Sequence, residues 1–492
     1  MRSGRGPVVM VIEQASSFQT QLAAGLSSVL EPLGIPLLLH LWGHSGARPP
    51  ASLVRVLQDG DPRAAVITPL TNSHSDRRLE RLLAHCPSLP LLHLGTVGPG
   101  CSVRADNAMG MQLVARHLVR DCHARRVLVV RGIDHHPDSR EREVAVRAEL
   151  ARLGVPITEQ QLVSGQFDRE TAHRVVRDAL EGDPEIDAIV ALNDRSALGA
   201  MDAVTMRGRR VPADVVVTGF DDEDFAAFSL PSLTTVSQNL HEQGVMAGEL
   251  LLRLLAGDDP GEVRVPVRLM VRGSTGCPPA VEAASEFPRE DLLWGQVAAL
   301  DAVLATNRRF LSCSTEEEIV EQLALSMPLL GITRGFLVLR TEEPGPARGL
   351  LTMAYYDGRH QQIAPHEPFD VAHQLPEHLR SHLHHGTLVV QPLAVGDTEI
   401  GYLVLDQVLG RGSCIGEALR MDLSRTIDTI RSTARLSERT RQLESEAASR
   451  LAAQRALAYR VDHDSLTGLA TRTAFLAHAE PAVADSVADS VD

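Results

Sequence analysis

Polar residues stand where two apolar runs of the chain end. Asn193 and Asp194 follow run 188–192, and Asp221 follows run 215–219. Amide and carboxylate side chains of this kind bind polar small molecules, and open α/β sheets bind ligands in the crevice beyond the carboxyl ends of their strands. The spacing therefore predicts a ligand-binding site, and we assign no catalytic residue.

The segment from Ile186 to Asp222 has the pattern of one strand-helix-strand unit, and the same alternation runs from Val8 to about Pro278. Amphipathic helices, such as 18–34, separate the apolar strands. Apolar strands with helical crossovers imply a mostly parallel sheet covered on both faces. The predicted strands are VVMVI, PLLLHLW, AAVITPL, PLLHLG, RVLVVRG, DAIVAL and DVVVTGF.

The pattern ALND..ALGAMDAV...G..VPADVVVTGFDD resembles the effector-binding core of the lactose-repressor (LacI/GalR) family. The resemblance also includes DNAMGMQLVARHL from Asp106, SREREVAVRAEL with Arg142, and SLPSLTTVSQN with Gln238. It implies an α/β, periplasmic-binding-protein-like domain over residues 7–278, in which two Rossmann-like lobes close on a small molecule.

The resemblance also implies which side chains hold that molecule. Arg142 matches the arginine of the family's R-x-x-G pattern, Asn193 and Asp194 match its N-D pair, and Asp221 matches the first acid after G-F. In the family these positions hold polar ligands, so we expect a sugar, nucleoside or base. Phe18 and His136 are placed to supply a stacking ring and a further contact. The expected ligand-binding residues are Phe18, His136, Arg142, Asn193, Asp194, Asp221 and Gln238.

Simpler structural roles compete for some of these residues. Asp194 suits the N-cap of the helix that follows it, Asp222 a cap or hinge, and Arg142 a surface ion pair. The sequence also departs from the family pattern at two places. Ala145 stands where glycine is usual, and residues 121–123 (Asp-Cys-His) replace a Gly-His turn.

The chain starts at the first expected strand, so we expect the DNA-reading helix-turn-helix of the repressors to be absent. The formal net charge of −15 also argues against a surface built to neutralise phosphates. Direct DNA binding is therefore predicted to be absent. A transcription regulator that has lost or borrowed its DNA-binding part is the alternative.

Length and composition set wider limits. A chain of 492 residues with 44% hydrophobic residues predicts two to four domains. Glu13 interrupts the N-terminal apolar run, which argues against a secretion signal, and no run is long enough to span a bilayer. The six scattered cysteines favour free buried thiols over disulfides or a zinc site. We expect a cytoplasmic protein without a cofactor or a resident metal.

The pattern changes after residues 279–290, a polar connector with proline near each end. A helix is expected over 292–311, and Ser314 with Glu317 forms a capping-box signature before a second helix. Four strands follow (GFLVLR, GLLTMAYYD, TLVVQPLAV and EIGYLVLDQV), and the last two flank a hairpin turn at Gly396-Asp397. With a closing helix from Glu417 to Leu436, this order resembles an α+β GAF-type sensory domain over residues 291–435.

Six histidines gather in this second domain: His366, His373, His378, His382, His384 and His385. His378 and His382 are four residues apart, as metal ligands on one helix face are. Prolines and polar residues surround them and no cysteine is near, so a solvated loop is favoured over a metal or haem site.

Residues 436–461 continue the closing helix with a four-three alternation at Leu436, Thr440, Leu443 and Ala447. The count then reaches Arg450 and Gln454 before Leu457 and Val461, which breaks the seam unless a four-residue stutter brings in Leu451. We expect a parallel two-stranded coiled coil, and hence a homodimer. A single long surface helix is the alternative.

The stretch YRVDHDSLTGLATRTAF resembles the opening of a GGDEF diguanylate cyclase domain, H-D-x-L-T-G-L-x-N-R. Thr471 replaces the asparagine, and the residues that match this pattern are His463, Asp464, Leu466, Thr467, Gly468, Leu469 and Arg472. We expect residues 462–478 to be the truncated start of such a domain and 479–492 to be a disordered acidic tail, without cyclase activity. The sequence thus predicts a cytosolic ligand sensor that resembles a regulated diguanylate cyclase.

Overall fold

The computed structural model describes residues 6–43, 48–70, 73–276, 301–341, 347–363, 367–406 and 413–477. The connector 279–290, part of the helix expected over 292–311, His366 and the tail 479–492 lie outside these residues. The chain divides into two units, Met1–Thr426 and Ile427–Asp492.

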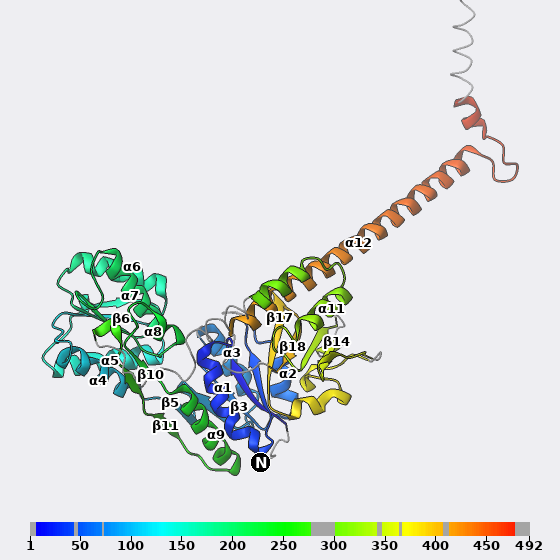
Figure 1. Cartoon of the computed structure of the whole chain (residues 1–492). Coiled ribbons are helices and arrows are strands. Elements are labelled where there is room, and N and C mark those ends of the chain that lie inside the picture. The colour runs from blue at the N-terminus through cyan, green and yellow to red at the C-terminus, as the bar shows by residue number, and fades with distance from the viewer. Residues whose placement is uncertain are drawn as a thin grey trace, which may run out of the picture. The chain divides into compact units, whose positions relative to one another are not determined.

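The first lobe is a parallel sheet with helices on both faces (Figure 1). Every residue of β1 and β2 is buried, because both faces of the sheet are covered. The strands are β1 (Val8–Ile12), β2 (Leu37–Leu41), β3 (Ala64–Ile67), β4 (Leu91–Leu94), β5 (Cys101–Ala105) and β11 (Glu262–Val265). The helices are α1 (Ser17–Leu30), α2 (Ala51–Asp59), α3 (Ser73–Ala84) and α9 (Leu240–Ala256).

The second lobe has a four-stranded parallel sheet in the order β7-β6-β8-β9. One core lies between this sheet and α4 and α5, and another lies between the sheet and α6 and α7. The strands are β6 (Val127–Arg131), β7 (Leu162–Ser164), β8 (Ala188–Ala191) and β9 (Val216–Thr218). The helices are α4 (Asn107–Arg120), α5 (Pro137–Arg152), α6 (Arg169–Gly182), α7 (Asp194–Met206) and α8 (Asp224–Phe228). The predicted two-lobe α/β fold is confirmed.

Several short strands of this region were not predicted. They are β5, β7 and β11, together with the antiparallel pair β10 (Thr235–Ser237) and β12 (Arg268–Met270). Three of these five strands have only three residues, which is too short for a periodic hydrophobic pattern to stand out.

Helices α1 and α9 pack with their backbones in close approach at two glycines. A Cβ added at Gly25 would lie 2.0 Å from the carbonyl oxygen of His241, and one added at Gly244 would lie 2.1 Å from that of Leu22. Neither position has room for a methyl group, so the absence of a side chain permits this crossing.

The second module, residues 301–426, is largely an antiparallel sheet with helices. Strands β17 (Thr387–Val395) and β18 (Thr398–Leu405) form the predicted hairpin around Gly396. The capping box of α11 (Glu316–Ser326) is formed by Thr315 and Glu318, so the prediction of Ser314 and Glu317 was wrong by one residue. The other strands are β13 (Gly335–Arg340), β14 (Arg348–Tyr356), β15 (Arg359–His360) and β16 (Phe369–Asp370).

The sheet of the first lobe continues into this second module. Strand β17 pairs in parallel with β2, from Thr387 opposite Leu37 to Val390 opposite His40. One hydrophobic core contains Leu38 and Trp42 of the first lobe together with buried residues of β13, β14 and β18. Residues that were expected to form two separate domains therefore share a sheet and a core, and the exact domain boundaries stay a prediction.

Polar contacts reinforce this junction from helix α2. The Arg55 guanidinium donates to Asp370 at 2.5 Å, and the Ser52 hydroxyl donates to Glu399 at 3.0 Å. The backbone N–H of Ala51, at the start of α2, also donates to the Glu399 carboxylate. Burial raises the pKa of Glu399, and these donors act in the opposite direction.

His378, His382 and His384 lie on a 3₁₀ helix, η6 (Glu377–His384), where a loop was predicted. His373, His378, His384 and His385 are exposed, whereas the His382 ring packs 4.5 Å from that of Tyr356. Within the described ranges, no group of three or more His, Cys, Asp or Glu residues is arranged to hold a metal. No helix there has the length and hydrophobicity needed to cross a membrane.

Helix α12 (Ser413–Asp462) is 50 residues long. Every residue from 433 to 461 is exposed in the single chain, including the seam positions Leu436 and Leu443. The long helix was predicted, and its pairing into a coiled coil stays a prediction.

Candidate ligand-binding site

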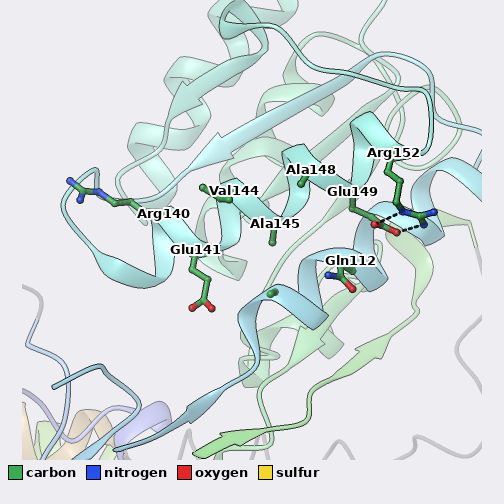
Figure 2. A pocket seen from close by; sticks show the side chains of 9 residues that line it. Gln112, Arg140, Glu141, Val144, Ala145, Ala148, Glu149 and Arg152 are labelled. Atoms are coloured by element: carbon green, nitrogen blue, oxygen red, sulfur yellow. Dashed lines mark hydrogen bonds and ion pairs between the residues drawn. The ribbon is translucent and has the colours of Figure 1, made fainter. Parts of the chain in front are cut away.

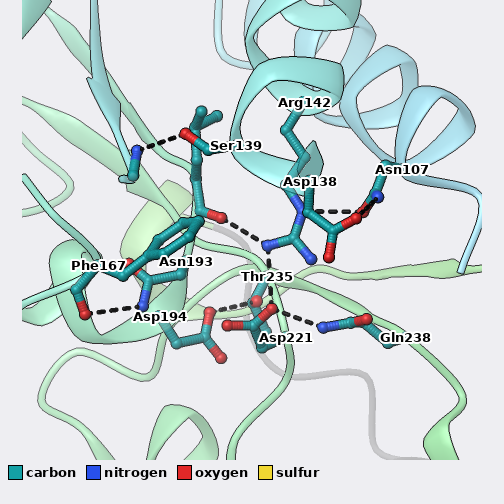
Figure 3. Close-up of polar contacts among 12 residues, drawn as sticks. Asn107, Asp138, Ser139, Arg142, Phe167, Asn193, Asp194, Asp221, Thr235 and Gln238 are labelled. Atoms are coloured by element: carbon teal, nitrogen blue, oxygen red, sulfur yellow. Dashed lines mark hydrogen bonds and ion pairs between the residues drawn. The ribbon is translucent and has the colours of Figure 1, made fainter. Parts of the chain in front are cut away.

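Arg142 is the centre of a buried polar network in the second lobe (Figure 3). Its Nε donates to Asn107 at 2.8 Å, and Nη1 donates to the carbonyl oxygen of Leu192 at 2.7 Å and to Asp221 at 3.1 Å. The guanidinium also lies 3.7 Å above the centroid of the Phe220 ring. Only 4% of Arg142 is exposed, so the alternative of a surface ion pair was wrong.

Asp221 follows β9 and faces this guanidinium. Its Oδ1 also accepts a 2.7 Å hydrogen bond from Nε2 of Gln238, which brings a third expected ligand residue into the cluster. Burial raises the pKa of Asp221 to about 7, against the opposing effects of Arg142 and Gln238. The residue has φ of 120°, a strained conformation for a side chain of this size, and such strain is frequent at functional sites.

Asp194 lies beneath the network and is fully buried. Its carboxylate accepts hydrogen bonds from the Thr235 hydroxyl at 2.5 Å and from the backbone N–H of Glu223 at 2.9 Å. Burial and the nearby charge of Asp221 raise the pKa of Asp194 well above its usual range. These contacts join α7 to the loop that carries Asp221.

Asn193, and not Asp194 as suggested above, is the N-cap of α7. Its Oδ1 accepts from the backbone N–H of Ser196 at 3.1 Å, and its Nδ2 donates to the carbonyl oxygen of Phe167 at 3.3 Å. Asp222 does not cap the next helix either: the N-cap of α8 is Glu223, and the Asp222 carboxylate pairs with Arg272 at 2.7 Å.

Aromatic rings lie at the ends of neighbouring strands. His136 packs edge-on against Phe167, with ring centroids 5.4 Å apart, and both follow strands of the second lobe. Burial lowers the pKa of His136, which favours the neutral ring. Phe18 belongs to α1 of the first lobe, where it packs against the lobe core and close to Gly95. Among the described residues, no hydrogen bond, ion pair or ring contact joins Phe18 to the Arg142 network.

Asn107 was not among the expected site residues, although it bridges the network to α5. Its Nδ2 donates to Asp138 at 2.9 Å and to Glu141 at 3.2 Å, while its Oδ1 accepts from Arg142. The residue begins α4, directly after strand β5, and is 2% exposed. The Asp106-Asn107 pair is part of the sequence that resembles the family, and this could have indicated that Asn107 belongs to the site.

One lobe-to-lobe contact lies near the carboxyl ends of the strands. The Ser17 hydroxyl of α1 donates to Asp224 of α8 at 3.3 Å, and both groups are exposed. A separate hollow of about 530 Å³ lies between α4 and α5 and is lined by Gln112, Val144 and Arg152, among others (Figure 2). It contains none of the seven expected ligand residues, so we do not assign the ligand to it.

Residues 115–275 match the family model of the periplasmic binding protein-like domain. The ribose operon repressor of Halalkalibacterium halodurans is 32% identical over 179 residues, which are 35% of this chain and 52% of that protein. The transcriptional regulator CelR of Thermobifida fusca is 31% identical over 169 residues, 34% of this chain and 48% of that protein. The chain spans about half the length of these curated relatives.

Solved structures with a similar chain trace include a complex of the transcriptional regulator CelR with cellobiose. It is 25% identical, covers 55% of this chain and 86% of its own, and has a TM-score of 0.49. A lac repressor dimer bound to operator and the anti-inducer ONPF is 26% identical, covers 55% of this chain and 82% of its own, and has a TM-score of 0.48. The relatives are named as transcription regulators, so the prediction that direct DNA binding is absent gains no support from them.

Proposed function

We propose that this chain senses a small polar ligand held between its two lobes, because residues 115–275 match the model of the periplasmic binding protein-like domain and the chain is similar to the ribose operon repressor of Halalkalibacterium halodurans. The observation that carries the proposal is the ion pair between the buried Arg142 of α5 and the partly buried Asp221, close to the carboxyl ends of β8 and β9. Removing a charged pair from water costs free energy. A polar ligand that binds beyond the strand ends would form hydrogen bonds with these groups in place of water.

The chemistry of the site favours a ligand with several hydroxyl or ring-nitrogen groups. Arg142 presents a planar fork of donors, Asp221 presents acceptors, and Gln238 offers an amide. His136 and Phe167 supply ring surfaces beside them. A sugar, a nucleoside or a base fits this combination.

Ligand binding would report to other parts of the chain by changing the balance between open and closed lobes. A ligand shifts such a balance only through its differential affinity for the two states. Residues of the second lobe, such as Asp221, and of the first lobe, such as Phe18, would both contact the ligand only in the closed state.

For the output, the relatives favour control of transcription. The ribose operon repressor and CelR are named as regulators of this kind, and residues 115–275, which match the periplasmic binding protein-like model, include Arg142 and Asp221. DNA binding by the whole protein would show as retardation of a duplex that weakens steeply as salt is raised. Retardation that is equally weak for every duplex sequence would count against this output.

A diguanylate cyclase output is the second candidate, carried by the HDSLTGL motif. Asp464 accepts hydrogen bonds from the backbone N–H groups of Leu466 and Thr467 and from the Thr467 hydroxyl, which forms a defined turn after α12. Incubation of the protein with GTP and Mg²⁺ tests this output. We expect no cyclic di-GMP, as predicted from the sequence, and its formation would overturn that prediction. We also propose that the second module is a GAF-like sensory domain.

Isothermal titration with a panel of sugars, nucleosides and bases tests the sensor function. At pH 8.5, above the pKa of about 7 of Asp221, we expect one ligand to bind the wild-type protein. Asp221→Asn removes the negative charge at nearly constant size, and we expect it to bind that ligand at least about ten-fold more weakly, because a charge-assisted hydrogen bond is lost. Asp178→Asn, at an exposed residue of α6, is the matched control and should bind normally. No heat from any ligand of the panel, or equal binding by Asp221→Asn, would contradict the proposed site.

A further inference from the structure

The end of helix α4 brings a thiol, an imidazole and a carboxylate into contact, away from the Arg142 network. The Asp121 carboxylate lies 2.9 Å from Nδ1 of His117, and Nε2 of the same ring lies 3.6 Å from Sγ of Cys122. His117 is 5% exposed and Cys122 is partly exposed. A Cys-His-Asp arrangement of this kind is the one that activates thiols in nucleophilic chemistry.

The hydrogen bonds define the direction in which a proton can move. When Nδ1–H of His117 donates to Asp121, the lone pair of Nε2 faces the Cys122 thiol and the Thr275 hydroxyl, which is 3.0 Å away. The Thr275 hydroxyl has a second polar neighbour, the Thr234 hydroxyl at 2.8 Å. The imidazole is therefore able to accept the thiol proton, leaving a thiolate beside an imidazolium.

The position at the end of a helix acts against the thiolate, but weakly. A helix C-terminus carries about half a unit of negative charge, spread over several carbonyl groups. The imidazolium carries a full positive charge within direct contact of the sulfur, and the carboxylate of Asp121 holds its ring in place. The attraction to the imidazolium is thus the larger of the two effects.

Other described cysteines lack this environment. Burial raises the pKa of the thiols of Cys86 and Cys101, both of which are buried. Cys313 is partly exposed like Cys122, and both thiols donate to a backbone carbonyl oxygen, Cys313 to that of Arg309 at 3.4 Å and Cys122 to that of Thr275 at 3.9 Å. Cys122 also has an imidazole beside its sulfur, whereas burial raises the pKa of Cys313. Cys313 therefore serves as the matched comparison for Cys122.

We propose that His117 and Asp121 maintain Cys122 as a reactive thiolate, a modification site for peroxides and soft electrophiles. With hydrogen peroxide, the thiolate sulfur attacks one oxygen, an S–O bond forms and the O–O bond breaks. The departing hydroxide takes the proton of the His117 imidazolium and leaves as water. The sulfur becomes a sulfenic acid, oxidised by two electrons, while the peroxide is reduced.

Modification at this sulfur reaches the last turn of the sensor domain. Sγ of Cys122 lies 3.9 Å from the carbonyl oxygen of Thr275, in η3 (Gly273–Thr275), and His117 is bonded to the hydroxyl of the same residue. An added oxygen or alkyl group would separate α4 from η3. The site thus gives the sensor domain a second chemical input that is independent of the ligand between the lobes.

Alkylation of the full chain by iodoacetamide between pH 6 and 9, followed residue by residue with peptide mass spectrometry, tests the proposal. At pH 7 we expect Cys122 to react at least about ten-fold faster than Cys313 and with a lower pH midpoint. His117→Gln should slow Cys122 to the rate of Cys313. Dilute hydrogen peroxide followed by a sulfenic-acid trap should label Cys122 before Cys313.

If His117→Gln unfolds, iodoacetamide will also alkylate the buried Cys86, and a second variant is then needed. Asp121 is 64% exposed, so Asp121→Asn should leave the fold intact. It should raise the pH midpoint of Cys122 and slow its reaction at pH 7 by about three-fold, while Cys313 reacts as before. Equal rates for Cys122 and Cys313, or a Cys122 midpoint that neither variant moves, would overturn the proposal.

Discussion

Arg142 shows how one side chain can connect strand ends that are distant in sequence. It bonds to Asn107, to the carbonyl oxygen of Leu192 and to Asp221, and so joins the starts and ends of three elements of the second lobe. Asp221 was predictable from its position after an apolar run, whereas Arg142 and Gln238 were expected only from the family resemblance and Asn107 was missed. Their pairing with one another was not predictable, because it depends on side-chain direction in the folded lobe.

At the same scale, His40 makes stability depend on pH. Its ring is fully buried in β2, and burial lowers its pKa from 6.5 to about 4. Between these values the unfolded chain binds the proton and the folded chain does not, so stability is lost as pH falls below about 6.5. From pH 7.5 to 5 the loss should be about 2 kcal/mol, since one pKa unit corresponds to about 1.4 kcal/mol.

Urea denaturation of the wild type and of His40→Phe at both pH values measures this effect. The variant has a ring of similar size that does not titrate, so its unfolding free energy should lack this part of the pH dependence. The same pH dependence in both proteins would mean that other groups cause it.

At the scale of elements, the hydrophobic pattern predicted the long strands correctly and missed the short strands. Strands β13 and β17 match their predicted residues, whereas β7 and β10, with three residues each, were missed. Cap positions shifted by one residue at both α7 and α11, because neighbouring Asn-Asp and Ser-Thr pairs offer two side chains that are equally able to cap a helix.

The crossing of α1 and α9 gives a prediction for this scale. Gly244→Ala would place a Cβ against the backbone of α1, so the helices must separate, and we expect a loss of about 2 kcal/mol or more in unfolding free energy. Gly182→Ala, at the end of α6 in open space, is the control and should be neutral or slightly stabilising. Thermal melting of both variants beside the wild type checks this, and equal melting temperatures would show that the two helices can move apart freely.

At the scale of the whole molecule, the shared sheet of the first lobe and the second module was beyond sequence-based prediction. Strand β2 reads as a continuous apolar run, and nothing local indicates that its second neighbour is β17, about 350 residues later. The pairing of the two elements is decided by packing in the common core, which contains residues such as Trp42 and Tyr402.

Self-association belongs to this scale as well. The exposed apolar positions of α12 predict a parallel dimer, and Leu443→Glu would put a charge into its seam. Sedimentation velocity should show a wild-type dimer and a largely monomeric variant. Ser445→Glu adds the same charge to the opposite side of the helix and should remain dimeric. A Leu443→Glu protein that sediments as a dimer would mean that the subunits meet elsewhere.

The pairing of β17 with β2 has a practical consequence for anyone who expresses the sensor region by itself. Ending the chain at Gly276 would remove β17, one of the two strands that pair with β2, and would leave unpaired backbone groups along β2 beside an uncovered hydrophobic surface. An exposed edge strand of this kind can pair with the same strand of another molecule. We expect the isolated fragment to aggregate when it is expressed, whereas in the longer chain β17 covers the edge of β2.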